Sequence, residues 1–351
     1  MRESDGPLQR CRGLQSRKGS APKAQSRRFR RREDDSTMDR SPDGQPVFPI
    51  DEATATRRKV RVLLLLLGLA LVVLGARWVS VIRFGPKDAG KGVPQDGLPD
   101  IAWVDVPAGP FIMGSDDPSF NAMARRTVTL PAFKISKYET TQAQWQAFTS
   151  AADGYGNADW WNEPTKLANR DEQPGEPTWP GADLPAESVS WYDAVAFTRW
   201  LTARLRKAGQ LDASTEIRLP TEAEWEKAAR GTDGREYPWG EGYKAGFANV
   251  VEPGGAAGTA NLMQTTAVGS YPQDASPFGA QDMAGNVWEW TLTEVEGRNA
   301  SDLTNDRPRV FRGGSWGDDP DDARASARHY GAPLNRSRYL GFRVVLAAPV
   351  P

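Results

Sequence analysis

The clearest indication of the fold is the stretch Arg218-Leu-Pro-Thr-Glu-Ala-Glu-Trp-Glu-Lys-Ala-Ala-Arg230. Thr221 and Glu224 have the spacing of a capping box, in which each side chain bonds a free backbone N–H at a helix start. Trp225 and the two alanines near the end of the stretch share one helix face. Gly231 follows directly, as is typical of a helix C-terminus. The stretch therefore predicts a short amphipathic helix that packs on a core through a tryptophan.

Two more helix starts have the same form. Thr141 and Gln144 have the capping-box spacing ahead of Trp145, and Ser190 and Asp193 open a longer helix. Ala194, Phe197, Leu201 and Leu205 fall on one face of that longer helix. We interpret the acidic side chains at these helix starts as caps in preference to catalytic groups.

Outside these helices the chain is rich in Gly and Pro and holds only short strand-like segments. Strand residues are expected at Val104, Val106, Phe111 and Met113, at Thr127, Thr129 and Leu130, and over Val287–Trp290, Val310–Arg312 and Phe342–Leu346. The pattern predicts one loop-rich α+β domain over residues 101–348. Buried aromatic side chains and bound ions are the expected sources of its stability, because the domain has no cysteine for a disulfide.

Composition divides the rest of the chain. Residues 1–59 hold 15 Lys and Arg, 9 Asp and Glu and few large apolar side chains, so we predict a disordered basic tail. Residues 83–100 are rich in Gly, Pro, Asp and Lys and are predicted to be a linker. Residues 84–351 hold 26 basic and 36 acidic side chains. This acidic surplus argues against nucleic-acid binding, which needs a concentrated basic face.

Val60–Ile82 is predicted to be a transmembrane helix. An unbroken run of Val, Leu, Ala and Gly fills the 15 residues of Val62–Ala76, fewer than the roughly 20 that cross a bilayer. Trp78 and the apolar residues after it extend the run if Arg77 reaches the interface. A buried core helix is disfavoured because nothing before residue 60 could pack around it. A signal peptide cleaved after Ala76 is the remaining alternative.

Basic residues precede this span at Arg57, Arg58, Lys59 and Arg61. The positive-inside rule then predicts a single-pass membrane protein with a cytoplasmic N-terminus and a periplasmic or extracellular domain. The only cysteine, Cys11, falls in the cytoplasmic tail. The exported domain therefore has no thiol for a disulfide, a metal or a nucleophile.

The only histidine is His329. A Ser-His-Asp catalytic triad could therefore use only this histidine as its base. A single histidine also excludes metal sites built from several histidines.

Five motifs occur in one order along the domain. They are Trp103-Val-Asp-Val-Pro-Ala-Gly-Pro-Phe-Ile-Met-Gly114, the Arg218–Arg230 stretch, Met283-Ala-Gly-Asn-Val-Trp-Glu-Trp290, Arg312-Gly-Gly-Ser-Trp316 and Leu340-Gly-Phe-Arg343. Together they resemble the sulfatase-modifying-factor family, which includes the formylglycine-generating enzymes, over nearly all of residues 101–347. The resemblance implies that family's loop-rich α+β fold, which is related to C-type lectins.

The family's oxidase binds copper through two active-site cysteines shortly after its Gly-Gly-Ser motif. The resemblance places Asp318 and Ala323 at these positions, and neither is a thiolate or a soft copper(I) ligand. Relatives in the ergothioneine pathway hold iron with several histidines, which one histidine cannot supply. No copper or iron site is expected.

The resemblance also implies a calcium site with ligands at Asp282, Gly285, Val287 and Glu289. Residues 285, 287 and 289 point the same way along an extended segment, so backbone oxygens and a carboxylate could meet Asp282 around a hard cation. The alternative is two ordinary loop acids. A second, weaker site is matched by Asn261 and Leu262, but the acidic stretch that completes it in the family is missing before Thr265.

The run Asp318-Asp-Pro-Asp-Asp322 takes the place of the oxidase cysteines. The plain interpretation is a solvated acidic loop. The alternative is that the loop lines a remnant pocket for a cationic or hydrogen-bonding ligand. Its other candidate residues are Ser315, Trp316, Arg328 and His329, of which the histidine could equally be structural.

Three functions follow from these patterns. The first is a membrane-anchored binding, scaffold or accessory domain for an exported protein or a small ligand. The second is a cysteine-independent extracytoplasmic oxidoreductase or tailoring enzyme. It would resemble the cysteine-free periplasmic members that help oxidise a siderophore chromophore, with Asp318, Arg328 and His329 as acid, base and oxyanion groups. The third, formylglycine generation on sulfatases, has the least support because both cysteines are absent.

Overall fold

The computed structural model describes residues 90–93, 97–117, 122–161, 173–252, 262–295, 303 and 305–350. The predicted tail 1–59, the predicted membrane span 60–82 and part of the predicted linker lie outside these residues. Within the described residues, no helix combines the length and the apolar character needed to cross a membrane.

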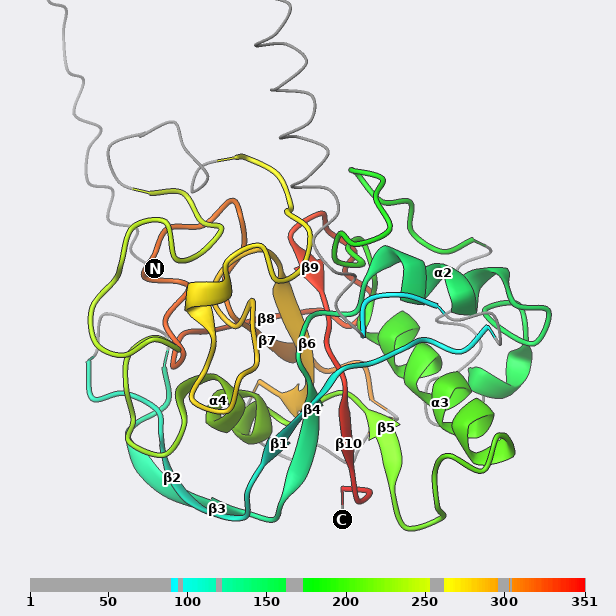
Figure 1. Ribbon diagram of the computed structural model, residues 1–351, viewed down its shortest axis with the longest axis horizontal. Coiled ribbons are helices and arrows are strands. Elements are labelled where there is room, and N and C mark those ends of the chain that lie inside the picture. The colour runs from blue at the N-terminus through cyan, green and yellow to red at the C-terminus, as the bar shows by residue number, and fades with distance from the viewer. Residues whose placement is uncertain are drawn as a thin grey trace, which may run out of the picture. The chain divides into compact units, whose positions relative to one another are not determined.

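Short helices and short strands alternate along the domain. The helices are α2 (Gln142–Ser150), α3 (Trp191–Lys207) and α4 (Glu222–Arg230), with 3-10 turns η1 (Ala158–Trp160) and η3 (Pro272–Asp274). The strands are β1 (Trp103–Val106), β2 (Gly109–Met113), β3 (Arg126–Leu130), β4 (Phe133–Ser136), β5 (Glu216–Arg218), β6 (Trp288–Glu294), β7 (Arg309–Arg312), β8 (Arg328–Gly331), β9 (Leu340–Gly341) and β10 (Val345–Ala347). Figure 1 shows α2 and α3 on one flank of the strands and α4 on the other. The predicted α+β class is confirmed.

All three predicted helix starts are confirmed as capping boxes. At α4, Thr221 Oγ1 accepts the N–H of Glu224, and the Glu224 carboxylate accepts the N–H of Thr221 at 2.8 Å. The starts of α2 and α3 have the same reciprocal bonds. Gly231 ends α4 with a φ of 71°, a left-handed conformation that glycine adopts without strain.

The strands form three sheets, in the orders β1-β4-β10-β5, β2-β3 and β8-β7-β6-β9. Of the predicted strand Phe342–Leu346, only Val345 and Leu346 lie in a strand, β10, and residues 342–344 connect β10 to the short strand β9 before them. β9 pairs in parallel with β6, whereas β10 pairs antiparallel with both β4 and β5. The chain leaves one sheet and enters the other through Phe342 and Val344, which are fully buried. This crossing joins the sheets through the core.

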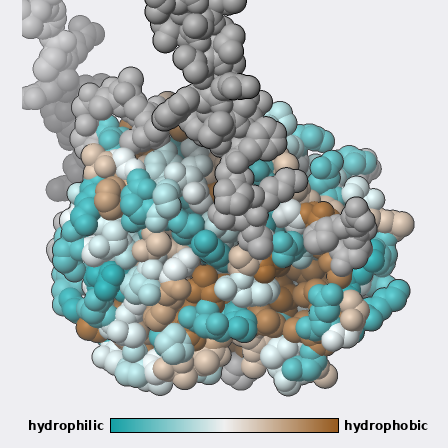
Figure 2. Space-filling model, viewed as in Figure 1, coloured by the Kyte–Doolittle hydropathy of each residue, from teal (hydrophilic) through white to brown (hydrophobic). Residues whose placement is uncertain are grey.

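Aromatic side chains fill the core between α2, α3 and the strands. Ring centroids lie 5.3–6.1 Å apart in the pairs Trp145–Phe148, Trp145–Phe197, Trp145–Phe342, Phe148–Trp200 and Phe197–Trp200. The indole N–H of Trp290 donates to the Val189 carbonyl at 2.9 Å, so this buried tryptophan keeps its polar partner. On the face in Figure 2, hydrophobic residues gather over the strands and towards α3, with hydrophilic residues on either side.

Part of the segment predicted as a linker is bonded to α2. The Gln144 side chain donates to the Gly90 carbonyl at 3.0 Å, and the Thr141 hydroxyl donates to the Lys91 carbonyl at 2.9 Å. The N–H of Gly90 in turn donates to Asp100 at 2.7 Å. Residues 90–93 are thus anchored on the start of α2.

Candidate functional site

A cavity of about 520 Å³ opens beside Asp318. Its walls come from Trp288 at the start of β6, Phe311 of β7 and His329 of β8, and from segments 317–318 and 335–340. The sheet β8-β7-β6-β9 therefore supplies a rigid floor, and two loops supply the rim.

Asp318 is the one acidic residue among those that line this cavity. The Trp288 indole N–H donates to its Oδ2 at 2.8 Å, and the Ser315 hydroxyl donates to the same oxygen. Burial, with the charge of Asp322 nearby, raises the pKa of the Asp318 carboxyl above its ordinary value. The cavity thus holds a fixed, partly desolvated carboxylate on an aromatic wall.

His329 stands on the same wall, with its side chain half exposed. Its ring centroid lies 4.8 Å from that of Trp288 and 6.2 Å from that of Phe311. Its Nε2 lies 3.1 Å from Asp322 Oδ1. This hydrogen bond raises the pKa of the His329 imidazole.

The structure separates Arg328 from the other predicted pocket residues. Adjacent strand residues point to opposite faces, so Arg328 points away from the cavity that His329 lines. Its guanidinium is buried against Glu222, with Nε 2.8 Å from Glu222 Oε1. Arg324, which follows the acidic run 318–322, forms ion pairs with Asp321 at 2.8 Å and with Glu236.

Ser315 and Trp316 lie behind the rim. Ser315 is fully buried and reaches the cavity through its bond to Asp318. Trp316 is also buried, and its ring stacks on Tyr339 at 4.5 Å and meets Trp179 edge-on at 5.1 Å. Of the five predicted pocket residues, Asp318 and His329 therefore line the cavity itself.

Arg336 lines the cavity and did not emerge from the sequence. Asp193 of α3 holds it, with hydrogen bonds of 2.8 and 2.9 Å to the two carboxylate oxygens, and Tyr155 donates to the same carboxylate at 3.1 Å. Burial raises the pKa of Asp193 to about 6. Asp193 was predicted as a helix cap, and the cap is present, but nothing in the sequence signalled its second partner 143 residues away.

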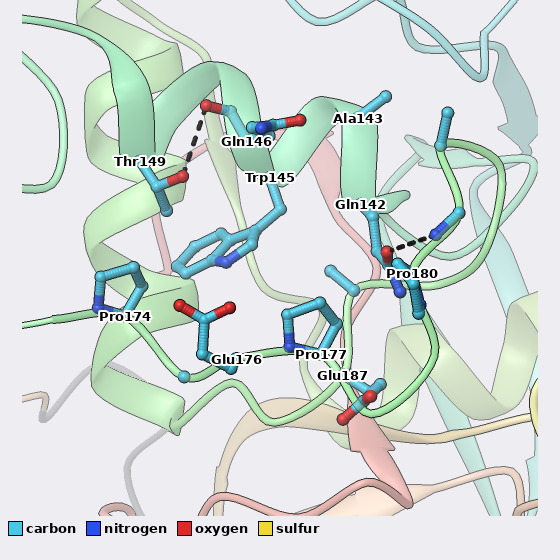
Figure 3. A pocket seen from close by; sticks show the side chains of 14 residues that line it. Gln142, Ala143, Trp145, Gln146, Thr149, Pro174, Glu176, Pro177, Pro180 and Glu187 are labelled. Atoms are coloured by element: carbon cyan, nitrogen blue, oxygen red, sulfur yellow. Dashed lines mark hydrogen bonds between the residues drawn. The ribbon is translucent and has the colours of Figure 1, made fainter.

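A second cavity of about 380 Å³ lies between α2 and the segment 174–187. Figure 3 shows the Glu176 carboxylate and the Trp145 ring facing each other across it, with proline rings on the far wall. Glu176 is exposed, and the carboxylate of Glu187 accepts hydrogen bonds from Thr178 and Ser188. The cavity beside Asp318 is the stronger candidate because its half-buried carboxylate shares the cavity with an imidazole, His329.

The predicted calcium ligands lie close together but differ in what already binds them. Arg343 donates to both oxygens of Glu289, at 2.6 and 2.7 Å, and the Trp225 indole donates to Oε2 at 2.6 Å. Asp282 accepts the Gly269 N–H at 2.6 Å through Oδ2. Its Oδ1 is buried and has no hydrogen-bond partner among the described residues. An orphaned buried oxygen of a hard carboxylate fits a calcium ion, whereas Glu289 is already held by a guanidinium.

The other two predicted ligands belong to the same turn. Gly285 has a φ of 79°, and a Cβ there would lie 2.4 Å from the Asn249 carbonyl, so only glycine fits. The N–H of Val287 donates to the buried Glu139 carboxylate at 3.3 Å. Across the part of the chain that the structure describes, no three Asp, Glu, His or Cys side chains are grouped so that they could hold a metal together.

The weaker second site is described only in part. Asn261 lies outside the described residues, and Leu262 is exposed. Nearby, Asn249 Oδ1 is buried with no hydrogen-bond partner in the described part of the chain, while its Nδ2 donates to Gln264 O at 2.9 Å.

Comparison with known proteins identifies the domain. Residues 93–348 match the family model of the sulfatase-modifying factor enzyme 1-like domain. Hercynine oxygenase of Mycolicibacterium smegmatis is 31% identical over 311 residues, which cover 75% of this chain and 66% of that protein. The chain thus spans less than two thirds of that oxygenase. The mouse inactive C-alpha-formylglycine-generating enzyme 2 is 29% identical over 296 residues, which cover 72% of this chain and 88% of that protein.

A solved structure shows the same fold. PvdO from Pseudomonas aeruginosa aligns with a TM-score of 0.55 and 27% identity over 74% of this chain and 99% of that one. The motif resemblance is therefore confirmed by both the sequence and the structure. The chain belongs to the sulfatase-modifying factor family.

Proposed function

We propose that the chain is a binding or accessory domain that takes a small cationic ligand at the cavity beside Asp318. The observation that carries this proposal is the Asp318 carboxylate, which is partly buried and fixed by Trp288 and Ser315 at the cavity wall. A carboxylate next to aromatic faces attracts a cation through both charge and ring quadrupoles.

The positions of the lost thiols support a change of chemistry. Asp318 stands where the resemblance places the first oxidase cysteine, and its hard oxygens are poor ligands for copper(I). Ala323, at the second position, is fully buried in a small cluster with Ala248, Val250 and Ala284. The similarity to a relative named an inactive formylglycine-generating enzyme is consistent with this interpretation. Formylglycine generation on sulfatases is the function with the least support.

The second candidate is a cysteine-independent oxidoreductase or tailoring enzyme. It is favoured by the His329–Asp322 pair, which places a titratable imidazole beside the Asp318 carboxyl in the same cavity. Arg328 takes no part in it, because its guanidinium is engaged by Glu222.

The proposed setting is extracytoplasmic. The support for this location is the apolar run of residues 60–82 with basic residues before it, which favours a single-pass anchor and an exported domain. Calcium is the proposed bound ion. An exported protein that carries the cationic group is an alternative to a free small ligand.

Ligand binding can be tested on the purified full-length chain. Arginine amide is titrated against it, with citrulline amide as the neutral isostere, and tryptophan fluorescence and thermal unfolding are followed. We expect the charged amide alone to bind, and Asp318→Asn to abolish binding. Asp319→Asn is the matched control, because Asp319 is an exposed acid of the same loop. Equal binding of the two amides, or full binding by Asp318→Asn, would contradict the proposal.

A complementation experiment separates binding from catalysis. Asp318→Asn, His329→Gln and Asp319→Asn are expressed in a deletion strain at equal membrane levels. A ligand-binding accessory loses function with Asp318→Asn and keeps it with His329→Gln, whereas an enzyme that uses the imidazole loses function with both. Conversion of a cysteine-containing sulfatase peptide to an aldehyde by the purified chain would overturn the low rank given to formylglycine generation.

A further inference from the structure

Hydrogen bonds fix the walls of the second cavity, which lies between α2 and the segment 174–187. The N–H of Gln142, in the first turn of α2, donates to the Leu184 carbonyl at 2.8 Å. The Gln142 side chain accepts the Gly181 N–H at 2.9 Å and donates to the Trp179 carbonyl at 2.7 Å. Helix start and loop therefore satisfy each other's backbone groups, so the cavity between them is preformed.

Trp145 of α2 forms one wall of this cavity. It is only 8% exposed, yet its indole N–H has no acceptor among the described residues. The seven other buried tryptophans of the described chain each donate their indole N–H to a protein acceptor; they are Trp161, Trp191, Trp200, Trp225, Trp288, Trp290 and Trp316. Figure 3 shows the nitrogen edge of the Trp145 ring turned towards Glu176 and Pro177. A buried donor that is left open on a cavity indicates that a ligand supplies the acceptor.

The lining of this cavity is acidic and apolar. It includes two carboxylates, those of Glu176 and Glu187, three proline rings and no basic side chain. Glu187 is buried, and both of its oxygens accept hydrogen bonds from the protein. Glu176 is exposed and has neither a hydrogen bond nor an ion pair with any described residue, so its charge is available to a ligand. This charge disfavours an anion and favours a cation.

We propose that this cavity binds a small organic cation that carries an uncharged acceptor oxygen, of the amino-alcohol class. The oxygen accepts the Trp145 N–H, and the cationic nitrogen lies between the Glu176 carboxylate and the indole ring, which face each other across the cavity (Figure 3). Both the carboxylate and the ring attract a cation. The volume of about 380 Å³ is near the lower end for ligand sites. The site is separate from the cavity beside Asp318 and does not depend on the function proposed there.

The test titrates choline into the purified full-length chain, together with two analogues that each lack one of the two features. In dimethylbutanol a carbon replaces the charged nitrogen, and in propyltrimethylammonium a methyl group replaces the hydroxyl. Isothermal titration and tryptophan fluorescence measure binding. We expect the neutral analogue to bind about tenfold more weakly than choline. The analogue without the hydroxyl should bind about fivefold more weakly.

Two variants assign these differences to their side chains. Glu176→Gln should weaken choline binding about threefold, because it removes a surface charge, and should leave dimethylbutanol binding unchanged. Glu241→Gln removes an exposed acid outside the lining and is the matched control, which should bind choline like the wild-type chain. Trp145→Phe removes the indole N–H, so it should abolish the preference for choline over propyltrimethylammonium. That preference in the wild-type chain is the second measurement if Trp145→Phe does not fold.

Three results would overturn the proposal. The first is that the wild-type chain does not bind choline, and the second is that it binds choline and dimethylbutanol equally. The third is loss of choline binding in Asp318→Asn with full binding in Glu176→Gln, which would place the cation in the other cavity.

Discussion

Two groups of buried carboxylates lie in this domain, and they are compensated in different ways. Those on α4 each face arginine: Glu222 pairs with Arg328, Glu224 with Arg218, and Glu226 with both Arg230 and Arg312. The second group is Glu139, Asp274, Asp282 and Glu289, which lie near one arginine, Arg343, and only Glu289 is hydrogen-bonded to it. Every α4 carboxylate is thus paired with an arginine, whereas Asp274 and Asp282 each have one buried oxygen with no hydrogen-bond partner among the described residues. Buried charge therefore marks a site only where hydrogen bonds and partners run out.

Removing an arginine from the α4 group is the strongest test of whether its ion pairs stabilise the fold. Arg312→Ala leaves the carbonyls of Ser326 and Ala327 without their donor and strips one partner from Glu226. We expect a loss of about 3–5 kcal/mol in the free energy of unfolding, because a buried charge loses its partner. Urea unfolding of the purified chain measures it.

Arg307→Ala is the control for that substitution. The Arg307 side chain is 56% exposed and lies 3.6 Å from the buried Glu294, which keeps the Asn305 amide as a donor, so we expect a loss of at most about 1 kcal/mol. Similar losses for the two substitutions would show that the buried network adds nothing beyond surface charge.

Trp225 contacts both groups of buried residues, so its replacement tests how much a single hydrogen bond to Glu289 contributes. Its ring lies 5.5 Å from the Arg312 guanidinium, and its indole N–H donates to Glu289 at 2.6 Å. Trp225→Phe keeps most of the ring and removes the donor, so we expect a loss of about 1–3 kcal/mol. The indole N–H of Trp239 bonds Gly242 at the surface, and Trp239→Phe should cost less than about 1 kcal/mol. Equal losses for the two substitutions would mean that the hydrogen bond from Trp225 to Glu289 does not add to the free energy of unfolding.

The sequence predicts the helices well because their signals are local. Each capping box lies within four residues, as at Thr221 and Glu224, and each was found in the structure. The strands β4, β5, β8 and β9 were missed, since they are two to four residues long and are defined by partners far along the chain, such as β10 for β5. Local pattern cannot report such pairings.

The candidate site was predicted in part for the same reason. Asp318 and His329 line the cavity; the family resemblance placed Asp318 there, and His329 stood out as the only histidine of the chain. Arg328 was grouped with them because it is adjacent, but period-two alternation in β8 turns it to the other face. Recognising β8 as a strand would have predicted that. Asp274 carried no signal at all, because a single aspartate in a loop has no spacing that distinguishes it.

The smallest expected effect on stability comes from Asp322, whose carboxylate is partly exposed and paired with His329. Asp322 lies 3.1 Å from His329 Nε2, with Asp318 also facing the imidazole. The His329 pKa is raised in the folded chain, so the pair stabilises the fold below the unfolded value of about 6.5. This stabilisation is lost as the pH rises through the raised folded value.

The imidazole is half exposed, so screening should keep this contribution well under about 1 kcal/mol. Unfolding measured from pH 5.5 to 8.5 should show wild type and His329→Gln converging as the pH rises. Asp322→Asn should remove the same increment, and the double variant should lose no more than either single one. A His329→Gln chain with the wild-type pH profile would mean that the imidazole does not titrate against Asp322.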